Sequence, residues 1–134
     1  MSVMVDSCVY LDIFTRDSRW FGWSSQALAN AANAGMIVLN PVIYAEISIR
    51  FRRIEELEAF LSLDVFEYRA IPREAAFLAG KCFLEYRRRG GRKSLPLPDF
   101  FIGAHAAIEN LTLVTRDVKR FRDCFPGLRL ISPK

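Results

Sequence analysis

Short apolar runs alternate with longer helix-forming stretches along the chain, and this alternation limits the fold more than any other feature of the sequence. The apolar runs are SVMV at 2–5, MIVLN at 36–40, VFEYRAI at 65–71, LTLVT at 111–115 and LRLIS at 128–132. Strands separated by helices indicate βαβ units, because parallel strands need crossover connections. The sequence therefore predicts an α/β fold with a mostly parallel central sheet and helices on both faces, a three-layer α/β/α sandwich.

Helix signals fill the intervals between these runs. A first helix is expected after Asp6, and others at 20–34, 41–51, 53–64, 72–89, 99–109 and 118–125. Proline suits the first turn of a helix, as at Pro41 and Pro72, and Gly35 stands where a helix is expected to stop. With 134 residues and no linker or repeat, the chain is predicted to form one domain, 1–134.

Composition excludes several classes of protein. Apolar residues make up 51% of the chain and charged residues 25%, which is typical of a packed globular protein. Cys8, Cys82 and Cys124 form no C-x-x-C pair, so neither a disulfide framework nor a thiolate zinc site is expected. The amino-terminal segment has no basic leader and is interrupted by Asp6 and Asp12, so it predicts neither a signal peptide nor a membrane span. We expect a cytoplasmic protein without a membrane partner.

Positive charge is concentrated in two short runs. The net charge is +4, but YRRRGGRK at 86–93 and TRDVKRFR at 115–122 hold a large share of the cations. Such runs indicate a polyanionic partner, although a solvated helix face produces the same pattern. Both interpretations remain open at this point.

Two aspartates follow strands directly or closely. Asp6 comes after SVMV, and Asp117 stands two residues after LTLVT. Ligands of an open parallel sheet bind outside the carboxyl ends of its strands, so both carboxylates are expected at the same edge. Glu46 is a third candidate, because its helical neighbours are largely apolar and a buried carboxylate needs a partner. An ion pair with Arg50, four residues later, is the alternative explanation of Glu46.

Asp99 is the only charged residue in LPLPDFFIGAHA at 95–106. On its own it is best explained as a helix cap. Its predicted helix also begins near the edge that holds the other three acids, and four neighbouring carboxylates would repel one another without a cation. Hard oxygen ligands favour Mg²⁺ or Mn²⁺ and phosphoryl-transfer chemistry, which needs no histidine base.

Two further polar residues have uncertain roles. His105, the single histidine of the chain, lies in an apolar helix and is better explained as a packed side chain than as a catalytic one. Asp12 either points toward the acidic site as an accessory residue or meets solvent.

The ordered set of motifs resembles the PIN-domain ribonucleases, in particular the VapC-type toxins of type II toxin–antitoxin systems. The motifs are VDS at 5–7, Glu46 within a hydrophobic helix, LPDFFIGAHA at 97–106 and LVTRDVKRF at 113–121. The resemblance implies that Asp6, Glu46, Asp99 and Asp117 form a catalytic metal site, with Ser7 and Thr115 as accessory residues. A helix cap is the alternative role of Ser7.

The resemblance also implies a function and partners. It implies an endoribonuclease dependent on Mg²⁺ or Mn²⁺ that cuts RNA, such as tRNA or rRNA, leaves a 3′-hydroxyl and a 5′-phosphate, and thereby inhibits translation and growth. A homodimer and a cognate antitoxin that covers the active site are implied as well. In this setting the cations expected to contact RNA phosphates are Arg88, Arg89, Arg92, Lys93 and Arg116.

Other functions share parts of this pattern. An aspartyl-phosphate phosphatase requires D-x-D after the first strand, but position 8 is Cys8. A phosphoacceptor receiver domain requires an aspartate after the third strand and a late lysine, and neither stands at the required place. A PIN-domain nuclease of RNA processing, or an RNA-binding module without an antitoxin, remains the alternative that the sequence does not exclude.

Overall fold

The computed structural model describes residues 2–90 and 97–134 and contains a five-stranded sheet with the strand order β3-β2-β1-β4-β5. Every neighbouring pair of strands is parallel. The strands are β1 (Val3–Val5), β2 (Ile37–Leu39), β3 (Phe66–Tyr68), β4 (Thr112–Val114) and β5 (Leu130–Ile131). The predicted α/β fold is confirmed.

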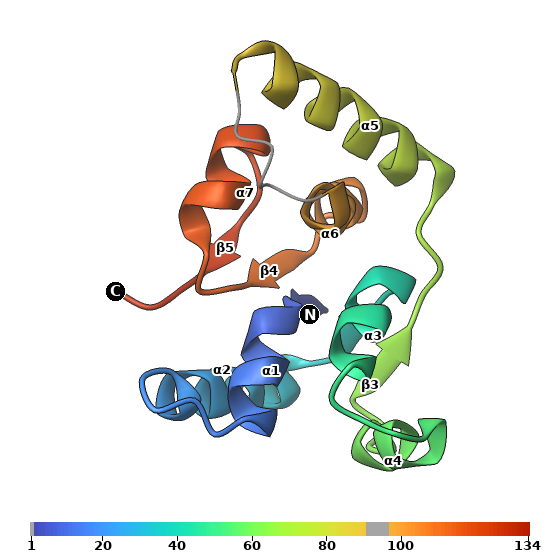
Figure 1. Ribbon diagram of the computed structural model, residues 1–134, viewed down its shortest axis with the longest axis vertical. Helices are drawn as coiled ribbons and strands as arrows, with labels where there is room; N and C mark the ends of the chain where they lie inside the picture. Colours follow the sequence, from blue (N-terminus) through green and yellow to red (C-terminus); the bar gives the residue numbers. More distant parts are fainter. Residues whose placement is uncertain (1, 91–96) are drawn as a thin grey trace.

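Helices connect the strands and cover both faces of the sheet. They are α1 (Ser7–Phe14), α2 (Phe21–Ala34), α3 (Pro41–Ser48), α4 (Ile54–Phe60), α5 (Arg73–Arg88), α6 (Leu97–Ile108) and α7 (Val118–Cys124). Figure 1 shows α5, α6 and α7 on one side of the sheet and α1, α2 and α4 on the other. In the part of the chain that is described, no helix combines the length and the apolar character that crossing a membrane requires.

Several predicted helix boundaries were wrong, among them the end of the helix expected at 53–64, which stops at Phe60. The helix expected from Pro41 to residue 51 ends at Ser48, so Arg50 lies outside it. Pro72 is the N-cap of α5 and not its first residue. The helix expected at 99–109 begins at Leu97, which places Asp99 within the first turn of α6 instead of at the cap position.

The three central strands are buried along their whole length, whereas β3 and β5 at the edges are partly exposed. This explains why the central runs are continuously apolar, since both faces of a parallel sheet are covered by helices. On one face, α6 approaches α7 closely at Gly103. A Cβ atom at Gly103 would lie 2.6 Å from Cδ2 of Phe125 and 3.1 Å from Cδ1 of Phe121. Glycine at this position lets the two helices pack together.

The strand order places β1 between β2 and β4, which are reached by connections that run in opposite directions from it. This is the point where an open α/β sheet forms a crevice at the carboxyl ends of its strands. Residues that follow β1 and β4 therefore face the same crevice, although they are more than 100 positions apart in the chain.

Candidate acidic active site

Asp6 and Asp117 occupy N-cap positions, but neither caps its helix with its side chain. Asp6 precedes α1 and Asp117 precedes α7, and neither side chain accepts a hydrogen bond from its helix backbone as a cap does. Asn40, at the corresponding position after β2, does cap: its side chain accepts from the backbone N–H of Ile43 at 2.9 Å. The carboxylates of Asp6 and Asp117 are thus oriented for other contacts.

Asp6 lies at the centre of the acidic group and is only 5% exposed. Its Oδ2 accepts a hydrogen bond from Thr115 Oγ1 at 2.8 Å and a weaker one from Cys8 Sγ at 3.5 Å. The backbone N–H of Asp117 donates to the same Thr115 oxygen at 3.0 Å. Thr115 therefore joins the end of β1 to the start of α7.

Glu46 is tied to the same centre by Ser7. The Ser7 hydroxyl donates to Glu46 Oε1 at 2.8 Å and lies 3.5 Å from Asp6 Oδ1. Ser7 is the first residue of α1, with Asp6 at the cap, so the helix-cap role considered for Ser7 is wrong. Arg50 is exposed and makes no ion pair with Glu46 in the described structure, so that alternative is wrong as well.

Asp99 and Asp117 are connected by an arginine. Arg120 Nη1 lies 2.7 Å from Asp99 Oδ2, and its Nη2 lies 3.1 Å from Asp117 Oδ2. The side chain of Asp99 is 9% exposed and that of Asp117 45% exposed. A continuous series of polar contacts, through Ser7, Thr115 and Arg120, thus links all four predicted acids.

Burial disfavours the ionised forms of Asp6, Glu46 and Asp99, and repulsion adds to this at Glu46 and Asp99. Burial raises the pKa of Asp99 to about 6, against the positive charge of Arg120. The negative charges of Asp6, Glu46 and Asp117 raise the same pKa. Burial is also the main cause that raises the pKa values of Asp6 and Glu46. The group is therefore electrostatically coupled and would be stabilised by added positive charge.

The donors suit a hard divalent ion, but the conformation is not closed around one. All four side chains offer carboxylate oxygens, the ligands that Mg²⁺ and Mn²⁺ prefer. Within residues 2–90 and 97–134, however, no three His, Cys, Asp or Glu side chains lie together closely enough to hold a metal ion. Arg120 instead binds two of the four carboxylates.

Comparisons with known proteins assign the family. A family model described as "PIN domain" matches residues 3–124. The chain belongs to the PIN domain family. By sequence, it matches no curated protein.

Solved structures similar to this PIN domain include three from toxin–antitoxin or related complexes. VapBC2 from Rickettsia felis, bound to a promoter DNA fragment, is 24% identical, with full coverage of both chains and a TM-score of 0.73. A toxin–antitoxin complex from Klebsiella pneumoniae is 23% identical, with 98% of each chain covered and a TM-score of 0.69. FitAcB from Neisseria gonorrhoeae is 16% identical, with 99% of this chain and 98% of that chain covered and a TM-score of 0.70. These similarities establish a common fold.

Asp12 and Arg116 form a separate pair beside the acidic group. Asp12 is 3% exposed, and its two oxygens accept from Arg116 Nε at 2.7 Å and Nη2 at 2.8 Å. Ser24 also donates to Asp12, at 2.7 Å, and the Arg116 guanidinium lies 5.4 Å from the ring centroid of Trp20. Asp12 therefore does not meet solvent, and Arg116 is its ion-pair partner. RNA contact by Arg116 stays a prediction.

The other predicted RNA-binding cations are only partly described. Arg88 ends α5 and Arg89 is its C-cap, and both side chains are exposed. Burial raises the pKa values of the Cys82 and Cys124 thiols and the positive charge of Arg89 lowers them, so Arg89 lies near these two residues. Cys124 is at the opposite end of α7 from Asp117. Arg92 and Lys93 lie outside the described residues. RNA binding by these four residues stays a prediction.

His105 is buried in α6 and holds that helix against the end of β2. The Asn40 amide has its oxygen bound to the Ile43 N–H, so its NH₂ group donates to His105 Nδ1 at 3.1 Å. His105 Nε2 then carries the proton and lies 3.3 Å from Glu109 Oε1. Burial lowers the pKa of His105, which favours this neutral form. These contacts agree with a packed histidine.

Sequence reasoning missed two side chains in this region. Arg120 was counted only as part of a basic run, although its position three residues after Asp117 on a helix predicts contact between them. Cys8 is the second: no local pattern of the sequence indicates its contact with Asp6.

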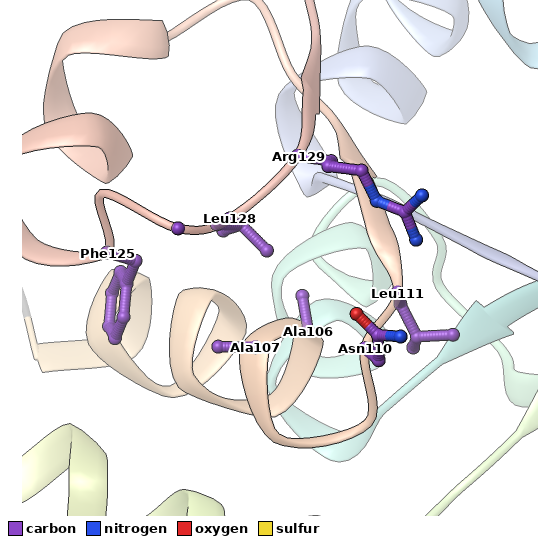
Figure 2. A pocket seen from close by; sticks show the side chains of 8 residues that line it. Ala106, Ala107, Asn110, Leu111, Phe125, Leu128 and Arg129 are labelled. Atoms are coloured by element: carbon purple, nitrogen blue, oxygen red, sulfur yellow. The ribbon is translucent and has the colours of Figure 1, made fainter.

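A separate pocket of about 250 Å³ lies at the other end of the sheet (Figure 2). It is bounded by the last turns of α6 and by the segments that lead into β4 and β5. The residues around it are Ala106, Ala107, Asn110, Leu111, Phe125, Gly127, Leu128 and Arg129. Among the described residues its lining includes no carboxylate, so it offers none of the chemistry of the acidic group.

Proposed function

We propose that this PIN domain is an endoribonuclease dependent on Mg²⁺ or Mn²⁺, and that it acts as the toxin of a type II toxin–antitoxin pair. The observation that carries the proposal is the meeting of Asp6, Glu46, Asp99 and Asp117 at the crevice between β1 and β4. Burial of Asp6, Glu46 and Asp99, and the repulsion that Glu46 and Asp99 experience, oppose folding, so these carboxylates are not explained by a role in stability. Sites that sacrifice stability in this way are typically functional.

The four carboxylates are the proposed metal ligands. A bound divalent ion would polarise the phosphoryl group and acidify a water molecule for attack at phosphorus. Ser7 and Thr115 orient the carboxylates of Glu46 and Asp6 through hydrogen bonds of 2.8 Å each. Hydroxyl donors of this kind fix ligand orientation and support affinity.

RNA and an antitoxin are the proposed partners. The basic runs supply charge for phosphate contacts, which position a strand without reading its sequence. The similar structures from R. felis and K. pneumoniae are toxin–antitoxin complexes, and this supports an antitoxin for the present chain. We propose tRNA or rRNA as the target, with arrest of translation and growth as the result, and a homodimer as the active assembly.

Cleavage of structured RNA by the purified protein tests the nuclease. We expect cleavage with Mg²⁺ or Mn²⁺, none with EDTA, and recovery when metal is restored. Asp99→Asn and Asp6→Asn are each expected to reduce the rate by at least about a hundredfold while circular dichroism shows an intact fold. Asp64→Asn is the matched control, because Asp64 is exposed and precedes β3 at the opposite end of the sheet. Cleavage that persists in EDTA would contradict the metal mechanism.

Expression in cells tests the toxin. Induction of the wild-type chain is expected to stop growth, and co-expression of a small neighbouring gene is expected to restore it. Asp99→Asn should not arrest growth. An active nuclease without such a neighbour, and without growth arrest, would instead support an RNA-processing role.

A further inference from the structure

Arg120 connects two acids of the acidic site that are 18 residues apart in the chain. Its guanidinium binds Asp99 on α6 and Asp117 at the start of α7, at 2.7 and 3.1 Å. Figure 1 shows these two helices on the same side of the sheet. Its side chain is 36% exposed, so the guanidinium is partly accessible to solvent and does not lie in the core.

The charge of Arg120 acts on the site as a whole. It favours the ionised forms of Asp6, Glu46 and Asp99, whereas burial disfavours these ionised forms. Arg116, four residues earlier, is instead committed to Asp12. Arg120 thus supplies to this group the kind of stabilisation that a bound cation gives.

A divalent ion and Arg120 compete for the same oxygens. Oδ2 of Asp99 already accepts a hydrogen bond from the guanidinium, and Oδ2 of Asp117 forms an ion pair with it. In this conformation no three acids of the described chain are gathered as ligands. A metal ion at these carboxylates would also be repelled by the guanidinium charge, since neither charge is fully screened in a partly buried site. Occupancy by one therefore weakens the other.

We infer that Arg120 is the built-in counter-ion of this acidic site, and that a divalent ion must displace it from Asp99 or Asp117. The displaced guanidinium stays at the mouth of the crevice, where it contacts a phosphate of the incoming RNA. Arg120 is therefore a positioning residue that lowers metal affinity in the free protein and favours joint binding of metal and substrate. This inference rests on the metal-dependent function proposed above.

Mn²⁺ binding without RNA tests the competition directly. Isothermal titration calorimetry is expected to show that Arg120→Ala and Arg120→Gln bind Mn²⁺ about tenfold more tightly than wild type. Arg120→Lys keeps the charge but loses the two-pronged geometry. Its Mn²⁺ affinity should therefore lie between that of wild type and that of the two neutral variants. Arg122→Ala is the matched control, because it removes the same charge from an exposed position of the same helix, and its affinity should equal that of wild type.

Cleavage at saturating Mn²⁺ supplies the second measurement. Arg120→Gln is expected to raise KM for RNA several-fold with a smaller change in kcat, and Arg120→Lys should recover most of the loss. Thermal unfolding verifies that each variant is folded, and Arg120→Gln retains the aliphatic stem if Arg120→Ala is unstable.

The outcomes separate this inference from the proposed function. Equal or weaker Mn²⁺ binding by both neutral variants, with wild type binding normally, would overturn the role of Arg120 and leave the metal-dependent nuclease standing. Failure of wild type and of every variant to bind Mn²⁺ would overturn the metal site itself, and the competition with it.

Discussion

Arg116 and Arg120 are four residues apart, and each forms ion pairs with aspartate. The two differ in how many of the carboxylate oxygens have a partner. Arg116 uses two nitrogens on a single buried partner, Asp12, whose carboxylate also accepts from Ser24. Arg120 divides its guanidinium between two carboxylates, one of which is 45% exposed. Within the described structure the first pair is saturated, whereas the second leaves carboxylate oxygens for another ligand. An ion pair whose carboxylate oxygens all have partners stabilises the fold. One that leaves carboxylate oxygens without a partner can respond to a ligand.

Replacing each arginine with alanine is expected to give the largest difference in stability between the two pairs. Arg116→Ala leaves Asp12 charged, buried and without its main partner, so we expect a loss of about 3 kcal/mol in the free energy of unfolding. Arg120→Ala removes a partner that two carboxylates share, one of them 45% exposed, and is expected to cost less than about 1 kcal/mol. Urea denaturation of both variants measures the difference. Equal losses would mean that the two pairs do not differ as proposed.

Overpacking at Gly103 tests the contact between Arg120 and Asp99 without removing a charge. A Cβ at this position would meet the rings of Phe125 and Phe121, so Gly103→Ala is expected to destabilise the protein by about 2 kcal/mol. It should also separate α6 from α7, and thus Asp99 from Arg120, and reduce cleavage beyond the loss in folded protein.

Gly80→Ala is the matched control for that substitution. Gly80 lies in α5, and a Cβ there would meet no atom within 4 Å. Alanine favours helix, so the variant should gain about 0.5–1 kcal/mol of stability with unchanged cleavage. A loss of stability at Gly80 equal to that at Gly103 would show that the cost is not one of packing.

The pH dependence of stability gives the smallest effect. The pKa of Asp99 is raised to about 6, above its unfolded value of 3.8, so the protonated form is favoured in the folded chain. Stability from this group is present at low pH and is lost as pH rises through 6. In EDTA, wild type should therefore gain about 1 kcal/mol between pH 7.5 and pH 5 relative to Asp99→Asn. Thermal or urea unfolding measures the stability of both proteins against pH. Parallel stability profiles for wild type and Asp99→Asn would contradict the raised pKa of Asp99.

The acids themselves were predictable from the sequence. Asp6 and Asp117 follow apolar runs that only a buried strand explains, and parallel strands bring their carboxyl ends to one edge whatever the details of packing. Glu46 and Asp99 were conspicuous because each carboxylate stands alone in an apolar segment. Periodicity and local composition determine these features, and both are properties of the chain alone.

The sequence by itself determined the α/β class, the order of elements and the four acids, because these depend on residue spacing and on burial of apolar runs. Only the tertiary structure decided which arginine pairs with which acid, which carboxylates accept hydrogen bonds from Ser7 and Thr115, and that Asn40 binds His105. Such contacts join residues from 39 to 109 positions apart for Ser7, Thr115 and Asn40. They depend on strand order and on side-chain rotamers, which local periodicity does not specify.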